Sequence, residues 1–311
     1  MNLQLLVKQY FNYRKSLGWR ACSESGYLGG FGRFMGADVD IAEVGVERVQ
    51  AYFDKNGAIT STWHTKHATL RSFYRYAISR GYVTASPLPV AIPKLPPRFI
   101  PYIYSHEELR RLLKAADSVH RRVDCCLAPV TMRSIVLLLY AAGLRLQESL
   151  DLTPAAVELN DSLLTIHRSK FDKTRLVPIG PQLRDALTQY SRTRVGGRDA
   201  PFFTTRAGER IKKPVVQEYF RILCLSEGIR RQDGVGEQPR LHDLRHSFAV
   251  HRLTSWYRQG ADVQKLLPHL STYLGHVDIQ STQAYLAMTP DLLDVAGKRF
   301  EQYAIKGEYD E

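Results

Sequence analysis

A proline-rich stretch divides this chain of 311 residues and limits the folds open to it. Six prolines fall between Ser86 and Pro101, at positions 87, 89, 93, 96, 97 and 101. Proline blocks helix formation and favours extended backbone, so the stretch predicts a linker of limited flexibility. We therefore expect two domains, residues 1–97 and 98–311, each long enough to bury its own hydrophobic core.

The first of these domains is expected to be small and helical. Apolar residues recur at helical spacing over residues 3–17, and Gly18 ends that helix. The last helix of the domain should end before Gly81, a suitable C′ residue. The three further helices that we expect here cover residues 23–35, residues 46–55, and the stretch from residue 61 or 62 to residue 80.

The second domain is expected to be mainly α with one small antiparallel β-sheet. Three short aliphatic segments are typical of strands, and Asn160-Asp161 supplies a turn between the first two. The expected strands are residues 157–159, 163–166 and 175–178. The expected helices are residues 105 or 106 to 116, 130–142, 182–193, 213–227, 241–259, 263–270, 279–287 and 290–301.

Both domains carry a positive charge, and the net charge of the chain is +12. Residues 1–97 hold 12 basic against 6 acidic side chains, and the rest of the chain holds 31 against 25, so each part is +6. Two basic domains fit a protein that grips a polyanion from both sides. Charge alone does not distinguish DNA from RNA, from an acidic membrane, or from a generally basic protein.

Neither the cysteines nor the histidines predict a metal or another cofactor. The four cysteines, which include the adjacent pair Cys125 and Cys126, lack metal-ligand spacing and indicate reduced thiols. His242 and His246 are four residues apart, but no glutamate follows the first of them as it does in zinc-binding helices. No signal peptide and no apolar run of membrane-spanning length occurs, so we expect a soluble, cytoplasmic protein.

Six residues of the second domain have side chains suited to phosphodiester chemistry. The transition state of phosphoryl transfer spreads negative charge over the nonbridging oxygens, and a guanidinium can bond two of these oxygens at once. A tyrosine hydroxyl, with a pKa of about 10, can attack phosphorus when nearby cations or a base help it to ionise. The six candidates are Arg145 in Gly-Leu-Arg-Leu-Gln-Glu, Lys170 in Ser-Lys-Phe-Asp-Lys, His242 and Arg245 in His-Asp-Leu-Arg-His, His276 in Leu-Gly-His, and Tyr285 in Ser-Thr-Gln-Ala-Tyr.

In order and spacing these motifs resemble those of the tyrosine recombinase (phage integrase) family, and the resemblance covers most of the chain. It implies that Tyr285 attacks DNA, forms a 3′-phosphotyrosyl link and frees a 5′-hydroxyl. It also implies that Lys170 protonates the departing oxygen, and that His276 contacts the scissile phosphate. His242 and Arg245 would lie on one face of a helix, since they are three residues apart. Glu148 would orient Arg145 or cap a helix.

Two features depart from the family pattern. Ser169 and Phe171 flank Lys170 where the family often has glycine, which leaves Lys173 as a rival general acid. The thirty-one residues from Arg245 to His276 exceed the compact versions of the family and suggest a subgroup of transposon-type recombinases. Tyr257 and Tyr273 are rival tyrosines, but neither has the family's spacing after a histidine.

The resemblance also implies partners. The N-terminal domain resembles the family's helical core-binding (SAM-like) domain, which with the catalytic domain clamps double-stranded DNA. The family works as a homotetramer on paired sites, a dimer on each, sometimes with an accessory DNA-bending protein, and such an enzyme would be associated with the nucleoid. An apolar C-terminal segment, residues 290–300, would pack on a neighbouring protomer or on its own domain. Candidate phosphate contacts of the first domain are Lys8, Arg14, Lys15, Lys66, Arg71 and Arg75.

We therefore expect a site-specific DNA recombinase that serves integration, excision, transposition or multimer resolution. A type IB topoisomerase uses the same tyrosine chemistry and is the first alternative. The second is a DNA-binding regulator that has lost catalysis. Retention of all six candidate residues argues against that loss, and the separate helical N-terminal domain argues for the recombinase.

Overall fold

The computed structural model divides the chain into two compact units, Met1–Phe99 and Ile100–Glu311. The division falls within the proline-rich stretch, close to the boundary expected at residue 97. Each unit has its own buried core, as the proline-rich division required. The structure describes residues 1–18, 22–55, 59–95, 100–118, 126–167, 174–197, 199–232, 238–276, 278–287 and 297.

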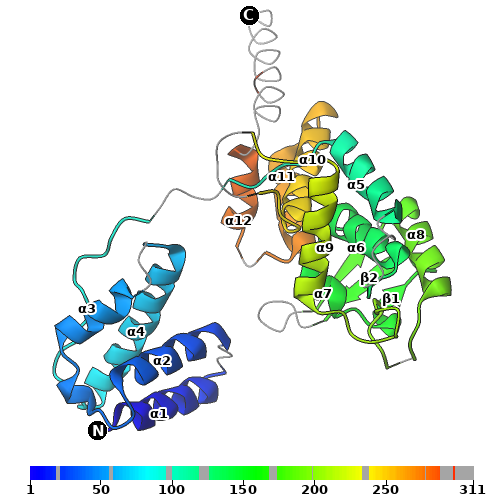
Figure 1. Cartoon of the computed structure of the whole chain (residues 1–311). Helices are drawn as coiled ribbons and strands as arrows, with labels where there is room; N and C mark the ends of the chain where they lie inside the picture. The colour runs from blue at the N-terminus through cyan, green and yellow to red at the C-terminus, as the bar shows by residue number, and fades with distance from the viewer. Residues whose placement is uncertain are drawn as a thin grey trace, which may run out of the picture. The chain divides into compact units, whose positions relative to one another are not determined.

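Among its described residues, the first unit has four α-helices, drawn from dark blue to cyan in Figure 1. Asn2 caps the first helix by accepting a hydrogen bond from the Leu5 amide. Phe31 and Phe73, both fully buried, lie at the centre of the aromatic core. All four expected helices are confirmed, with ends shifted by one residue at most. They are α1 (Leu3–Ser16), α2 (Cys22–Met35), α3 (Val46–Asp54) and α4 (Ser61–Ser79), with a 3-10 turn at Ile41–Glu43.

The second unit is a larger helical domain with one small sheet (Figure 1). Its expected class, mainly α with an antiparallel sheet, is confirmed. Its helices are α5 (His106–Ser118), α6 (Pro129–Ala141), α7 (Leu146–Leu150), α8 (Pro181–Thr193), α9 (Lys213–Ser226), α10 (Asp243–Arg258), α11 (Val263–Leu274) and α12 (Gln280–Gln283), with 3-10 turns at Pro154–Ala156 and Ala284–Ala287.

Three helix expectations need correction. The short helix α7 was not predicted, because five residues carry too little periodicity. The expected end of α11 at Leu270 was wrong: the helix continues past the internal Pro268 to Leu274, since burial of its apolar face outweighs the lost hydrogen bond. The helix expected over residues 279–287 is a short α-helix followed by a 3-10 turn. Apart from residue 297, the helix expected over residues 290–301 lies outside the described residues.

The sheet has three antiparallel strands in the order β1 (Val157–Glu158), β2 (Leu163–Ile166), β3 (Arg175–Pro178). Val157 and Val177 both pair with Leu164, and all three side chains are buried. The turn expected at Asn160-Asp161 is present, and it closes with Ser162 at a φ of 53°. β3 is an edge strand of the sheet, and it contacts α11. This contact is part of the candidate site.

Two clusters of apolar side chains make up the core of this unit. The main cluster surrounds α6, whose Ile135 and Leu138 are fully buried and which packs on α5, α8 and α10. The second cluster joins α10, α11 and the last 3-10 turn, and it contains Phe248, Leu274 and Tyr285. The proposed nucleophile is therefore fixed by packing with residues from α10 and α11.

Gly143 connects α6 to α7 through a left-handed backbone with φ of 59°. A Cβ at this position would lie 2.6 Å from Cδ1 of Phe248 and 2.9 Å from Cδ2 of Leu274. Glycine is therefore required here for two reasons: the left-handed backbone conformation and the close approach of α10 and α11.

We predict that Gly143→Ala lowers the free energy of unfolding of the second unit by about 2–4 kcal/mol, the sum of backbone strain and overpacking. Gly228→Ala is the matched control, because Gly228 has a φ of 65° with no atom near its Cβ position. It should cost only about 1–2 kcal/mol. Urea unfolding of both variants gives the comparison, and equal losses would contradict the role of close packing at Gly143.

Candidate active site

Arg145 lies between α6 and α7, and its charge is only partly covered. Its Nη1 donates to Oε1 of Glu148 at 2.8 Å, and its Nη2 donates to the Gly275 carbonyl at 3.1 Å. The Glu148 carboxylate also accepts the backbone N–H of Arg145 at 3.0 Å, which caps α7. Both expected roles of Glu148, orienting the arginine and capping a helix, are therefore observed.

Arg245, in the first turn of α10, is almost fully buried, with 2% of its surface exposed. Its Nη1 donates to the Gly143 carbonyl at 2.6 Å, and its Nη2 donates to the Leu274 carbonyl at 2.7 Å. Burial and the nearby charge of Arg145 lower the pKa of Arg245 to about 10, so the guanidinium stays charged at neutral pH. Because these acceptors are neutral carbonyls, its positive charge is not cancelled by a carboxylate in direct contact.

A third arginine, Arg175 at the start of β3, completes a network that the sequence analysis missed. Its Nη1 and Nη2 donate to the two carboxylate oxygens of Glu148 at 3.1 and 2.8 Å. Its Nε donates to the Tyr273 carbonyl at 3.0 Å. Gly275, with φ of 68°, lies against this guanidinium, and a Cβ there would lie 2.7 Å from Nη1. The only signal in the sequence was an arginine at the start of an otherwise apolar strand.

The Glu148 carboxylate is charged, although its side chain is only 8% exposed. Burial raises its pKa, but hydrogen bonds and charge from Arg175, together with hydrogen bonds from Arg145, outweigh burial and lower the pKa to about 2. One carboxylate thus holds two guanidinium groups, and the trio keeps a net positive charge. This arrangement ties β3, α7 and the end of α11 to one another.

Tyr285 lies in the 3-10 turn Ala284–Ala287 and is 2% exposed. Its hydroxyl is 3.1 Å from Nδ1 of His246. The ring of His276 stacks beside it, with centroids 6.0 Å apart. Burial raises the pKa of Tyr285, while the charges of Arg245 and Arg145 act in the opposite direction. The phenol therefore lies beside both candidate phosphate ligands.

The two candidate histidines lie on separate elements. His276 follows α11, and its Nδ1 is 2.6 Å from the Thr282 hydroxyl on α12, which fixes the ring. His242 stands at the N-terminal end of α10 with only part of its surface exposed, whereas Arg245 of the same motif is buried. Partial burial and the charge of Arg245 lower the pKa values of both histidines, so both are neutral near pH 7.

Five of the six candidate residues come together in this way. Contacts or electrostatic interactions link Arg145, His242, Arg245, His276 and Tyr285. Lys170 and its rival Lys173 lie outside the described residues. Within the described part of the chain, no group of three His, Cys, Asp or Glu residues could hold a metal ion. None of its helices is long and apolar enough to cross a membrane.

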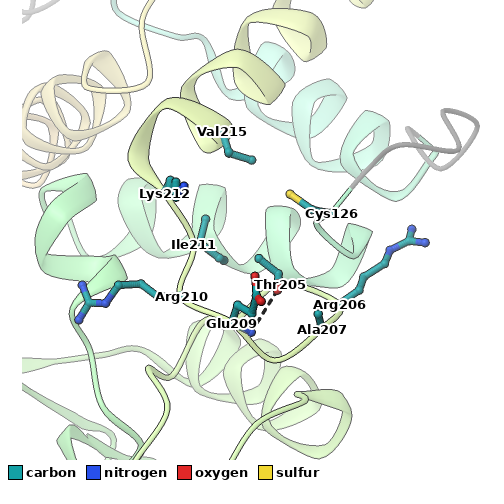
Figure 2. A pocket seen from close by; sticks show the side chains of 9 residues that line it. All are labelled: Cys126, Thr205, Arg206, Ala207, Glu209, Arg210, Ile211, Lys212 and Val215. Carbon is teal, nitrogen blue, oxygen red and sulfur yellow. Dashed lines mark hydrogen bonds between the residues drawn. The ribbon is translucent and has the colours of Figure 1, made fainter.

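The segment between α8 and α9 presents a hollow of about 310 Å³ (Figure 2). Its basic side chains are exposed, and those of Arg206 and Arg210 extend in opposite directions from the segment (Figure 2). Arg210 pairs with Asp151 at 2.6 Å. Lys213, at the start of α9, contributes to the lowered pKa of His242, so this basic segment adjoins the candidate site.

The basic candidates of the first unit lie on the outer faces of α1 and α4. Lys8 and Lys15 of α1 are exposed, as are Arg71 and Arg75 of α4. Arg14 is partly buried, because its Nη1 donates to the hydroxyls of Tyr10 and Ser72. Lys66 lies over the Tyr52 ring at 5.3 Å from its centroid.

Comparison with known sequences identifies clear relatives. A sequence profile of the phage integrase family matches residues 103–291. The integrase/recombinase y4rB of Sinorhizobium fredii is 36% identical over 304 residues, which cover 95% of this chain and 96% of that protein. The tyrosine recombinase XerD of Caulobacter vibrioides is 31% identical over 257 residues, or 79% of this chain and 78% of XerD.

Comparison with solved structures gives the same fold. The Tn1549 transposon integrase in complex with a circular intermediate DNA has a TM-score of 0.70 at 15% identity, and the match covers 96% of this chain and 99% of that one. A lambda integrase dimer bound to a core site has a TM-score of 0.67 at 17% identity, covering 93% and 97% of the two chains.

We predict that Glu148→Gln lowers the free energy of unfolding at pH 7 by roughly 3 kcal/mol, as the depressed pKa requires. The folded-state pKa lies below the unfolded value, so this stabilisation is complete above about pH 4.5 and is lost as the pH falls towards 2. Urea unfolding at pH 7 and pH 3 measures the difference. Glu158→Gln, at an exposed strand position, is the control. An effect of Glu148→Gln that is equal at both pH values would contradict the ion-pair network.

Proposed function

The chain belongs to the phage integrase family of tyrosine recombinases, which are site-specific DNA recombinases, and from this premise we propose that it cuts and rejoins DNA through a 3′-phosphotyrosyl link on Tyr285. The observation that carries the proposal is the convergence of two guanidinium groups on one buried tyrosine. At the end of α11, Arg145 donates to the Gly275 carbonyl and Arg245 donates to the Leu274 carbonyl. A phosphate that bonds both arginines would lie beside the phenol.

The two arginines would supply most of the transition-state stabilisation. Their guanidinium groups donate to nonbridging oxygens, where negative charge accumulates as the Tyr285 oxygen approaches phosphorus. Both groups are already fixed by hydrogen bonds, so little reorganisation accompanies the reaction. His242 and His276, from two different elements, would complete the set of phosphate ligands.

In the reaction one bond forms, one bond breaks and two protons are transferred. The Tyr285 oxygen forms the new bond to phosphorus, the bond from phosphorus to the 5′-oxygen breaks, and the phenolic proton passes to a neutral acceptor. Lys170 gives a proton to the departing 5′-oxygen. The energy of the broken bond is kept in the phosphotyrosyl link, so the 5′-hydroxyl of another strand can reverse the step without ATP.

DNA binding would use both units, because both parts of the chain are basic: residues 1–97 and residues 98–311 each carry a net charge of +6. In the first unit, the exposed cations of α1 and α4 would contact phosphates, which makes affinity depend on salt but does not read sequence. In the second unit, Arg206 and Lys212 beside the hollow of Figure 2 would supply further phosphate contacts. Lambda integrase forms a tetramer on a Holliday junction, and we propose the same assembly here, as a dimer on each of two sites.

The biological role that we favour is movement of a genetic element. The long interval between Arg245 and His276 suggested a transposon-type recombinase, and the structural similarity to the Tn1549 transposon integrase supports that role. XerD-like resolution of multimers is the second role, supported by the similarity to XerD over 79% of this chain. The same chemistry serves both, so the DNA substrate distinguishes them.

We predict that incubation with nicked DNA fragments from the flanks of the gene traps a covalent adduct on Tyr285. Nicking lets the short strand beyond the cut diffuse away, which prevents rejoining. Mass spectrometry of the nucleotide-bearing peptide locates the adduct, and a labelled 5′-hydroxyl strand confirms the polarity. Tyr285→Phe should abolish the adduct. Tyr273→Phe is the matched control and should retain it, because the Tyr273 hydroxyl donates to the Pro178 carbonyl.

The same assay distinguishes the alternatives. An adduct that persists in Tyr285→Phe would rule out the proposed nucleophile. Tight binding to one fragment without any adduct would favour a DNA-binding regulator. Relaxation of supercoiled DNA that lacks a specific site would favour a type IB topoisomerase.

We predict that Lys170→Ala slows cleavage of ordinary DNA by roughly 10²- to 10⁴-fold, the usual contribution of a general acid. A 5′-bridging phosphorothiolate has a thiolate leaving group that needs no proton, so it should restore most of the rate. Single-turnover cleavage of the two substrates measures this rescue. Lys173→Ala should cleave both substrates at close to the wild-type rate. If Lys173→Ala is instead the variant that is slow on ordinary DNA and rescued by the phosphorothiolate, Lys173 is the general acid.

A further inference from the structure

The Tyr285 hydroxyl has a partner that the proposed mechanism leaves without a role. Nδ1 of His246 lies 3.1 Å from the phenolic oxygen, and the two ring centroids are 5.5 Å apart. His246 follows Arg245 directly on α10, so one turn of helix carries both a phosphate ligand and a contact to the nucleophile. His246 is half-buried, and the ring of His242 stands nearly perpendicular to it at 4.8 Å.

The surroundings decide which group donates this hydrogen bond. Arginine has no acceptor, so Arg245 can only donate to the phenolic oxygen, and the phenolic O–H is then free to point to the opposite side. Burial, together with the neighbouring His242, Arg245, Arg240 and His276, lowers the pKa of His246 to about 3. The imidazole is therefore neutral near pH 7, and its Nδ1 can accept the phenolic proton in a hydrogen bond.

We propose that His246 is a positioning residue that fixes the Tyr285 hydroxyl for attack by accepting its hydrogen bond. The proposal rests on the proposed function, in which Tyr285 is the nucleophile. With the O–H directed at Nδ1, the lone pairs of the oxygen face Arg245 and Arg145, which is the side where a bound phosphate would lie. The hydrogen bond thus selects the phenol orientation that is productive for attack.

His246 holds the proton in place but does not remove it. A Tyr285 pKa above 10 and a His246 pKa of about 3 leave full proton transfer strongly unfavourable. The phenolic proton therefore leaves to a different acceptor when the phosphate arrives. This assignment predicts that cleavage has no pH limb belonging to His246 between pH 5 and pH 8.

The hydrogen bond itself can be tested without DNA. In protein labelled with ¹⁵N-histidine, Nδ1 of His246 should show the NMR shift of an unprotonated nitrogen that accepts a hydrogen bond. Tyr285→Phe should move this signal towards the value of a free nitrogen, whereas Tyr273→Phe should leave it unchanged. A protonated Nδ1, or a signal that does not respond to Tyr285→Phe, would overturn the proposal.

Three substitutions test the role in cleavage. His246→Phe fills the volume without an acceptor, His246→Ala removes both, and His246→Asn offers an amide oxygen close to the position of Nδ1. We expect His246→Phe and His246→Ala to slow single-turnover cleavage at saturating DNA by roughly 10- to 100-fold, because small misplacements of a reacting atom cost this much. His246→Asn should recover most of the rate, and DNA affinity should be similar in all three.

The phosphorothiolate substrate separates this role from others. A residue that acts on the nucleophile gains nothing from a better leaving group, so the defect of His246→Phe should persist on that substrate. Rescue there, or wild-type cleavage by His246→Phe, would overturn the proposal, as would a His246→Asn variant no better than His246→Ala. If the wild-type rate has a pH limb that His246→Phe removes, His246 acts as a general base and not as a positioning residue. These outcomes are distinct from failure of the proposed function, which would appear as cleavage by Tyr285→Phe.

Discussion

The second unit depends on one buried charge, the guanidinium of Arg245. Burying a charged group with 2% of its surface exposed is costly unless it is hydrogen-bonded, and here the Gly143 and Leu274 carbonyls accept from its two terminal nitrogens. Those acceptors come from the end of α6 and the end of α11, so the arginine joins both helices to α10. Because carbonyls are neutral, the positive charge stays available to an anion. The same bonds thus serve the fold and the proposed chemistry.

Around this charge, two glycines with left-handed backbone set the geometry. Gly143 allows Phe248 and Leu274 to pack against the backbone, and it offers its carbonyl to Arg245. Gly275 ends α11, lies against the Arg175 guanidinium and offers its carbonyl to Arg145. Each candidate arginine is therefore held by a carbonyl from a residue that has no side chain to obstruct it. Glu148 supplies the one carboxylate of this network and holds Arg145 beside Arg175.

Much of the fold could be predicted from the sequence because its signals were local. The helices of the first unit have clear apolar periodicity, and the strands around Asn160-Asp161 have a clear turn. The signals failed where tertiary packing overrides local preference. Leu274 is helical because the core of α10 and α11 buries it, despite Pro268 within the same helix. The five residues of α7 form a helix because the Glu148 carboxylate caps them. A helix of five residues is too short for its apolar periodicity to be recognised in the sequence.

For the candidate site, too, local sequence signals and tertiary packing explain different features. The sequence was enough to identify the chemical groups, since the order of Arg145, His242, Arg245, His276 and Tyr285 carries the family resemblance, and arginines with a tyrosine suit phosphoryl transfer. Which of these groups come into contact could be seen only in the folded protein. Arg175 reaches Glu148 from 27 positions away, and the His246 ring reaches the Tyr285 hydroxyl from 39. Such contacts follow from how α10, α11 and β3 pack, and packing depends on the summed burial of many side chains rather than on any short motif.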